Sequence, residues 1–307
     1  MIYTCTMNTA IDLYVAIDNL KPDRVNRTFD EDYQANGKGV NVSIMLQKMG
    51  IENTALGFIG GFTGKFIEEE LTKQGINSDF INVDGITRIN VFVNADEEYK
   101  IVNQGPEVGQ KDVDNLLQKI KTIPKGSILI VSGSLPRGVE ESILVDIAKI
   151  CAENDVNLVI DSSSSIVLET LPYRPYLLKP NEEELAYLVG KDMPLSEQEI
   201  IVYGKELLYK GAKNVIISRG GNGAIFLNDN HLVNVSSPVG EVVNTACSGD
   251  SLLAAFIAKT MENAPLDVTL KYAVATGAST AFSKGLSDLS NIAELMKQVS
   301  ITNYRGD

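Results

Sequence analysis

Short apolar runs alternate with longer amphipathic stretches through most of the chain. After about residue 110 the alternation is regular, and apolar strands are separated by segments of helical periodicity. Strands that are buried on both faces of a sheet are continuously apolar, so this pattern predicts an α/β fold, a doubly wound and mostly parallel sheet flanked by helices. The strand candidates are residues 1–7, 54–59, 128–131, 158–160, 176–178 and 215–218, and the helix candidates include residues 40–49, 182–189 and 197–209.

Two segments, at about residues 12–35 and 86–105, do not follow this pattern. Residues 88–93 and 99–102 alternate apolar and polar positions around a polar turn, which predicts a β-hairpin. We expect the two segments to pair into a small separate sheet, a lid that covers one edge of the main sheet. The chain is therefore predicted to form one α/β domain over residues 1–307, with the two lid segments inserted.

Residues 60–65 follow a predicted strand and are expected to form a turn. Their Gly64-Lys65 pair suggests the end of a phosphate-binding P-loop, but that motif needs a glycine five residues before Gly64 and a Ser or Thr after the lysine. The chain has neither, since Phe66 follows Lys65. The P-loop interpretation is therefore excluded.

A polar stretch at residues 243–251 lies between an apolar, strand-like run and the apolar, helix-like run 252–257. Ser248 is predicted to be the N-cap of that helix, with Asp250 in the first turn. The first N–H groups of a helix have no partner within it and the helix dipole is positive there, so this turn is a ready anion site. A bound phosphate repels a carboxylate, which indicates that Asp250 addresses a hydroxyl group that attacks the phosphate. The alternative is a capped helix whose aspartate only complements the dipole.

Composition and charge argue against several classes of function. The chain has 307 residues, a net charge of −13 and a pI near 4.7, with no basic cluster, so nucleic-acid binding is not expected. Cys5, Cys151 and Cys247 are odd in number and scattered, which argues against a disulfide framework or a zinc site, and His231 alone cannot support a His-based site. No apolar run approaches the ~20 residues that span a membrane, and the N-terminus lacks a secretory pattern. We expect a cytoplasmic protein that does not bind membranes.

The stretch Asn244-Thr245-Ala246-Cys247-Ser248-Gly249-Asp250-Ser251 resembles the carboxy-terminal signature of the ribokinase-like (PfkB) carbohydrate kinases. The resemblance implies that Asp250 is the catalytic base and that the backbone of Cys247, Ser248 and Gly249 forms an anion hole. Cys247 stands where the family usually has glycine. We expect an ordinary backbone conformation at Cys247 and, because it lies near a helix N-terminus, a thiol with a lowered pKa.

A second stretch, Asn36-Gly37-Lys38-Gly39-Val40-Asn41, resembles the amino-terminal signature of the same family, with Asn36 replacing one glycine. The resemblance implies that the sugar contacts Asp12, Gly37, Gly39 and Asn41, although a tight turn before a helix would also explain the glycines. The sugar-phosphate branch of the family uses three cations, and the matching residues here are Lys38, Arg88 and Arg137. Arginine forks and a lysine point charge both suit a phosphate group.

Three further stretches resemble the nucleotide side of the family. Lys179-Pro180-Asn181-Glu182-Glu183-Glu184 resembles its Asn-x-x-Glu motif, which implies that Lys179 and Asn181 contact ATP and that Glu184 holds Mg²⁺ through water, as Mg²⁺ prefers. An acidic first turn that complements the helix dipole is the alternative. The resemblance also implies ATP contacts in a glycine-rich loop and in a later helix, from Ser218, Gly220, Gly223 and Gly277.

The match extends from residue 1 to about residue 284, in the order of the family, and favours the branch of 1-phosphofructokinase and tagatose-6-phosphate kinase. It implies ATP-dependent and Mg²⁺-dependent phosphorylation of a ketohexose monophosphate, fructose 1-phosphate or tagatose 6-phosphate, to a bisphosphate. It also suggests a homodimer formed through the lid. A kinase for an unphosphorylated sugar or nucleoside is one alternative, and a non-catalytic sugar-phosphate-binding protein on the same fold is another.

Overall fold

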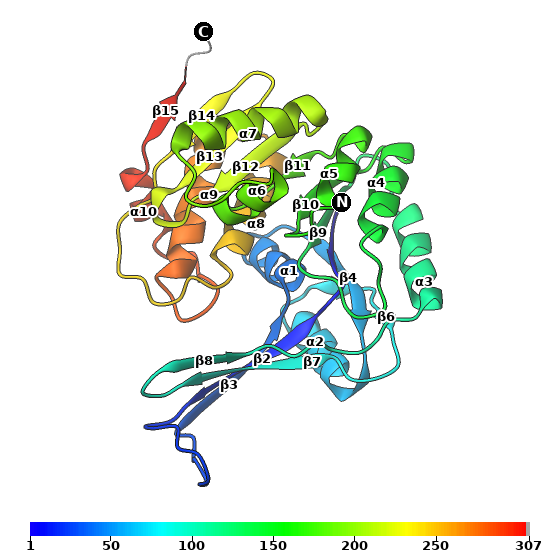
Figure 1. Cartoon of the computed structure of the whole chain (residues 1–307), viewed down its shortest axis with the longest axis vertical. Coiled ribbons are helices and arrows are strands. Elements are labelled where there is room, and N and C mark those ends of the chain that lie inside the picture. The colour runs from blue at the N-terminus through cyan, green and yellow to red at the C-terminus, as the bar shows by residue number, and fades with distance from the viewer. Residues whose placement is uncertain (305–307) are drawn as a thin grey trace.

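The computed structural model describes residues 1–304 and contains one large sheet and one small sheet (Figure 1). The large sheet has eleven strands, and its central strands are parallel while β12 to β15 form an antiparallel edge. Its spatial order is β15 (Ile301–Asn303), β14 (Leu232–Val235), β13 (Ala224–Asn228), β12 (Asn214–Ser218), β11 (Leu177–Leu178), β10 (Asn157–Asp161), β9 (Ile128–Ser132), β1 (Ile2–Thr6), β4 (Asn53–Ile59) and β5 (Asn77–Ser78), with β6 (Ile81–Asn82) also paired to β4.

Helices cover both faces of this sheet, because its central strands are apolar on both sides. Leu129 and Val131 of β9 belong to one buried cluster and Ile130 to the other. The first cluster includes helices α3 (Gln110–Lys121), α4 (Ile143–Glu153), α6 (Glu182–Leu188) and α7 (Glu197–Lys210). The second includes α1 (Lys38–Lys48), α8 (Ser248–Met261), α9 (Leu266–Ala281) and α10 (Ile292–Gln298).

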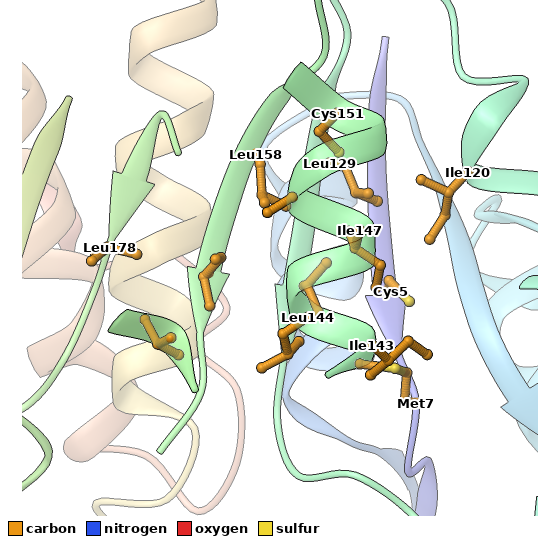
Figure 2. Close-up of a cluster of buried hydrophobic side chains, with 14 of the residues drawn as sticks. Cys5, Met7, Ile120, Leu129, Ile143, Leu144, Ile147, Cys151, Leu158 and Leu178 are labelled. Atoms are coloured by element: carbon orange, nitrogen blue, oxygen red, sulfur yellow. The ribbon is translucent and has the colours of Figure 1, made fainter. Parts of the chain in front are cut away.

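Figure 2 shows how one of these helices lies on the sheet. The α4 side chains Leu144, Ile147 and Cys151 point toward Leu129 of β9 and Leu158 of β10. The predicted doubly wound architecture is therefore confirmed. Two short helical segments, α5 (Val167–Thr170) and the 3₁₀ turn η1 (Leu171–Tyr173), connect β10 to β11. In residues 1–304 no helix has the length and apolar character needed to cross a bilayer.

The small sheet has the order β3 (Asp30–Asn36), β2 (Ala10–Ala16), β7 (Arg88–Asn94) and β8 (Glu98–Ile101), and it projects from the main body on the side away from β15 (Figure 1). The predicted hairpin is confirmed as the antiparallel pair of β7 and β8. Exposed apolar side chains such as Phe29 and Ile101 occur on or beside this sheet. The homodimer expected through it stays a prediction.

Two local expectations were wrong. Residues 236–247 have no regular structure, so no strand precedes the polar stretch before α8. Residues 61–65 are not a turn but the start of α2 (Gly61–Lys73). The hydroxyl of Thr63 donates to the carbonyl oxygen of Thr87 at 2.8 Å, and the side chain is buried. Tertiary contact with the segment before β7 thus stabilises a helix start that the glycines alone would not predict.

The close contact between β1 and β4 makes a stability prediction at Gly57. Gly57 lies opposite Thr6 with φ of 135°, and a Cβ atom there would come within 1.9 Å of the Thr6 carbonyl oxygen. Gly50 also has a positive φ, 77°, but open space around its Cβ position. We expect Gly57→Ala to lower the free energy of unfolding by roughly 2–5 kcal/mol and Gly50→Ala by about 1–2 kcal/mol. Equal costs in urea unfolding would contradict this account.

Candidate active site

A cavity of about 720 Å³ is lined by residues at the carboxyl ends of β11 and β12 and by the start of α8. Ligands bind at this edge of open parallel sheets, because the loops that follow the strands meet there. The cavity brings together most of the residues selected from the sequence, namely Asp12, Lys38, Asn41, Lys179, Asn181, Glu184, Ser218, Gly220, Gly223, Cys247, Ser248, Gly249, Asp250 and Gly277.

Asp250 lies in the first turn of α8 and is only 5% exposed. The side-chain amide of Asn41 donates to its Oδ2 at 2.9 Å. Burial, together with the negative charge of Asp161, raises the pKa of Asp250 to about 6, although Asn41 and two lysines oppose the shift. A carboxylate with a pKa in this range can accept a proton near neutral pH.

Asp161, which was not among the site residues selected from the sequence, organises the charges beside this cavity. Asp161 ends β10 and is fully buried between two lysines: its Oδ1 lies 3.1 Å from Nζ of Lys38, and its Oδ2 lies 3.2 Å from Nζ of Lys179. Although burial opposes the charged form, the two lysines hold the pKa of Asp161 below its ordinary value. The available signal was the resemblance of the turn at residues 161–164 to a turn of the sugar-phosphate branch.

Lys179 connects this charge network to the start of α8. A Cβ atom on Gly249 would lie 3.2 Å from Nζ of Lys179, so the lysine sits close above the helix N-terminus where the glycine leaves room. Lys179 is itself 4% exposed. A buried cation beside free helix N–H groups makes this corner a strong anion site.

The three cations selected from the sequence fall into two groups. Nζ of Lys38 turns to Asp161 and lies 3.6 Å from Oε1 of Glu184. Arg88 and Arg137 instead meet at one loop: Nη1 of Arg88 donates to the carbonyl of Asn103 at 3.2 Å, and Nη2 of Arg137 donates to that of Gly105 at 2.7 Å. These contacts place Arg88 and Arg137 beside one loop and Lys38 beside Asp161 and Glu184.

Gly37 and Gly39 do not line the cavity. A Cβ atom on Gly37 would lie 2.6 Å from Cγ2 of Thr6, and one on Gly39 would lie 2.4 Å from its Oγ1. The two glycines thus let the start of α1 pack directly on β1. This packing positions Asn41, whose amide contacts Asn36 and Asp250.

Asp12 is buried on the small sheet, at its junction with the cavity. The side-chain amide of Asn90, which faces Asp12 in register, donates to its Oδ1 at 2.8 Å. Burial raises the pKa of Asp12, while Asn90 and the charge of Arg88 oppose the shift. Asn90 was not singled out from the sequence, since its role depends on the pairing of β2 with β7.

Asn181 and Glu184 cap the start of α6. The backbone N–H of Glu184 donates to Oδ1 of Asn181 at 2.7 Å, and the backbone N–H of Asn181 donates to Oε2 of Glu184 at 2.9 Å. This capping box uses one carboxylate oxygen of Glu184 and leaves Oε1 facing Lys38. The acidic first turn that was the alternative to the metal interpretation is therefore present, and its Glu184 belongs to a capping box.

The far end of the cavity is apolar. It is formed by an irregular loop after β14 and by one face of α9, with Pro238, Val239, Val242, Val274, Ala278, Ala281 and Phe282. These residues line the same cavity as the glycine-rich turn after β12, where Gly220 and Gly223 both have positive φ. The helix was expected on the nucleotide side from its resemblance to the family, whereas the loop was not selected from the sequence.

The expectations for Cys247 were wrong. Its backbone is left-handed, with φ of 62° and ψ of 0°, and it occupies the cap position before α8, whereas Ser248 is the first helical residue. Burial and the charges of Asp250 and Asp12 raise the pKa of its thiol, so the thiol is protonated at neutral pH. Burial is the larger cause and the two carboxylates add to it, which is opposite to the lowering expected from the helix N-terminus. Sγ lies 3.2 Å from the side-chain nitrogen of Asn41.

A buried carboxylate beside an anion-binding helix N-terminus, in a cavity with an apolar far end, defines the class: a phosphotransferase with an alcohol group as acceptor. Residues 3–293 match the profile of the pfkB family carbohydrate kinases, and the chain belongs to this family.

Two relatives and one solved structure are similar to this chain over almost its whole length. The chain is 52% identical to D-tagatose-1-phosphate kinase of Bacillus licheniformis (99% of this chain, 100% of the relative) and 33% identical to 1-phosphofructokinase of Bacillus subtilis (98% and 99%). It superposes on phosphofructokinase-2 from Escherichia coli in complex with substrates and products with a TM-score of 0.89 at 26% identity, covering 96% of this chain and 98% of that chain.

The strained backbone at Cys247 makes a prediction about stability. A left-handed conformation costs a residue with a Cβ atom about 1–2 kcal/mol, a cost that glycine avoids. We expect Cys247→Gly to be more stable than Cys247→Ala by about 1 kcal/mol, after the greater chain entropy of unfolded glycine is allowed for. Both variants lose Sγ, so the difference between their free energies of unfolding reports the cost of the backbone conformation. If urea unfolding found the alanine variant equally stable, the left-handed turn would be in doubt.

Proposed function

We propose that this protein transfers the γ-phosphoryl group of ATP to the 6-hydroxyl of a ketohexose 1-phosphate, giving ADP and a 1,6-bisphosphate. D-Tagatose 1-phosphate is the first choice of substrate and fructose 1-phosphate the second, because the names of the relatives that are 52% and 33% identical contain these sugars. The tagatose 6-phosphate expected from the sequence is not retained, since those names place the phosphate on carbon 1.

The observation that carries the proposal is the separation of an arginine pair from the carboxylate at the start of α8. Arg88 and Arg137 do not line the cavity but gather at the loop of residues 103–105, and this arginine pair suits the phosphate of the sugar. Asp12 neighbours Arg88, and the charges of both Asp12 and Asp250 act on Cys247. This order supports a substrate whose phosphate lies at one end, whose ring hydroxyls meet Asp12 and Asn41, and whose acceptor hydroxyl meets Asp250.

Asp250 acts as the general base in this proposal. Its carboxylate accepts the proton of the 6-hydroxyl while the hydroxyl oxygen forms a bond to the γ-phosphorus and the bond to ADP breaks. The transition state of phosphoryl transfer is loose and needs little early proton removal, so orientation of the hydroxyl matters as much as basicity. The hydrogen bond from Asn41 to Oδ2 supports that orientation.

The N-terminus of α8 and the two lysines stabilise the transferred group. Backbone N–H groups of Cys247, Ser248 and Gly249 meet its oxygens, and Lys179, which lies directly above Gly249, adds charge at the same place. Lys38 lies between Asp161 and Glu184 and is proposed to contact the phosphates of ATP rather than the sugar. Fixed donors of this kind stabilise developing charge without reorganisation.

Magnesium fits the residues at the start of α6 through water. No group of three or more His, Cys, Asp or Glu side chains able to hold a metal ion occurs in residues 1–304, so an all-protein cage is not expected. Glu184 offers a carboxylate oxygen beside the phosphate path, and Mg²⁺ usually keeps several waters when it binds ATP. When bound, the ion would neutralise charge on the phosphates.

The apolar far end of the cavity accommodates the adenine of ATP in this proposal. Ser218, Gly220, Gly223 and Gly277 line the same region as the apolar residues of α9. The small sheet, which carries Asp12, would cover the sugar and exclude water from the reacting groups.

A substrate panel tests the proposed function. We expect ATP-dependent turnover with kcat/KM highest for D-tagatose 1-phosphate, followed by fructose 1-phosphate, and at least about 10-fold lower for tagatose 6-phosphate and fructose 6-phosphate, since loss of a charge-assisted contact costs about 1.5–3 kcal/mol. Products are identified as bisphosphates by phosphorus NMR. A preference for 6-phosphates or for free sugars would refute it.

Arg88→Met serves as the matched variant in this panel. It keeps the aliphatic stem and removes the guanidinium, so KM for the sugar phosphate should rise about 10-fold or more while KM for ATP stays within about twofold. Lys65→Met, which removes an exposed lysine on α2, should change neither constant.

The pH profile tests Asp250. Its base form is lost as pH falls through the raised pKa of about 6, so kcat should drop about 10-fold per unit below that pH. Asp250→Asn should lower kcat by about 10²–10⁴ and abolish this limb. Because sugar phosphates titrate in the same range, Arg88→Met is the control: it removes a positive charge proposed to contact the sugar phosphate and should move the limb to higher pH only if the limb belongs to that phosphate. An unmoved limb in Arg88→Met, together with its loss in Asp250→Asn, would assign it to Asp250.

A further inference from the structure

Arg219 forms a two-armed ion pair immediately before the glycine-rich turn. Its Nε lies 2.7 Å from Oε1 of Glu182, and its Nη1 lies 2.8 Å from Oε2 of Glu197. The side chain is only 11% exposed, so both contacts are partly shielded from water. A guanidinium has the planar fork needed to bridge two carboxylates at once, and lysine does not.

The ion pair between Arg219 and Glu182 joins the glycine-rich turn to α6, the helix that carries Glu184, the proposed magnesium residue. Glu182 is the first residue of α6, between Asn181 and Glu184 in the capping box. The backbone adds a second tie, since the N–H of Ser218 donates to the carbonyl of Pro180 at 3.0 Å. The end of β12 and the start of α6 are thus joined by one backbone contact and one side-chain contact.

The ion pair between Arg219 and Glu197 connects the turn to the segment that follows β15. Glu197, the first residue of α7, accepts hydrogen bonds from the hydroxyl of Tyr304 and from the side-chain amide of Asn234. Tyr304 follows β15, and its backbone N–H donates to the carbonyl of Leu232 at 3.0 Å. These contacts lower the pKa of Glu197 and keep it charged toward Arg219.

The turn is closed by its own backbone, since the N–H of Arg219 donates to the carbonyl of Gly223 at 2.8 Å, and Gly223 packs against the backbone of Val235. Gly220 and Gly221 instead have open space around their Cβ positions, and Gly220, Gly221 and Gly223 line the cavity. A glycine segment without close packing loses much conformational entropy when a ligand orders it. A contact that orders the turn beforehand increases affinity for that ligand.

We propose that Arg219 is a positioning residue for ATP: it holds the turn at residues 219–223 against the starts of α6 and α7, and Tyr304 on the C-terminal segment supports it by fixing Glu197. The inference rests on the proposed function, because it takes the cavity beside this turn as the ATP site. Arg219 does not line that cavity itself, so its effect on ATP is indirect.

The test compares ATP affinity in variants of the full chain. Arg219→Met should weaken ATP binding at least 10-fold by calorimetry, with a matching rise in KM for ATP, while KM for the sugar phosphate stays within twofold. Arg219→Lys should give an intermediate loss, because one ammonium cannot bridge both glutamates. Tyr304→Phe should weaken ATP binding about two- to fivefold, since it leaves the ion pairs in place.

Two further measurements separate positioning from a general structural role. Lys210→Met removes a lysine paired to Glu206 at 2.7 Å on the exposed end of α7 and should leave ATP affinity unchanged. In Arg219→Met, amide hydrogen exchange should become faster at residues 219–223 while the core strands keep their protection.

The outcomes are distinguishable. If the wild-type protein binds no ATP, the proposed function fails and this inference fails with it. If the wild type binds ATP and Arg219→Met binds it equally well, or loses ATP and sugar-phosphate affinity together with its thermal stability, the inference alone is overturned. Should Arg219→Met not fold, Arg219→Lys and Tyr304→Phe decide the question by the same comparison.

Discussion

The arrangement of the candidate site depends on the burial of Asp161 between Lys38 and Lys179. These ion pairs lie at 3.1 and 3.2 Å, and the carboxylate is fully buried. Lys179 is buried as well, and removing one partner of such a buried pair costs about 3–5 kcal/mol, because it leaves an uncompensated charge. The carboxylate also lets two cations sit close together before any phosphate arrives. Since Lys38 begins α1, Lys179 follows β11 and Asp161 ends β10, one charged group ties three segments to the same point.

The same carboxylate acts on Asp250. Burial raises the pKa of Asp250, the charge of Asp161 raises it further, and the two lysines moderate the shift. Phosphate ligands would repel the Asp250 carboxylate and raise its pKa further. The positive charges of Lys38 and Lys179 oppose that rise and keep Asp250 able to act as a base near neutral pH. The position of Lys179 above Gly249 connects this balance to the helix N-terminus. The charge of Lys179 and the dipole of α8 therefore act at the same place, the start of α8.

The left-handed turn at Cys247 and the close contacts of Gly37 and Gly39 with β1 position the starts of α8 and α1. α8 begins at Ser248, directly after the left-handed residue Cys247, and its first residues line the cavity. α1 can begin beside β1 because Gly37 and Gly39 carry no side chain that would collide with Thr6. The two helices then meet through Asn41, Cys247 and Asp250. The small sheet completes the site by bringing Asp12 and Asn90 together.

The sequence by itself determined the doubly wound sheet, the hairpin and half of the residues that line the cavity. Apolar periodicity reflects burial on both faces of a strand, and residues after parallel strands must meet at one edge. The tertiary structure alone decided the partners across that edge: Asp161 with two lysines, Asn90 with Asp12, and Arg219 with two glutamates. It also decided the conformation and pKa of Cys247, the start of α2 and the partners of the three predicted cations. Charge pairing, burial and backbone strain depend on distances between segments that are far apart in the chain, and residue patterns within one segment do not contain those distances.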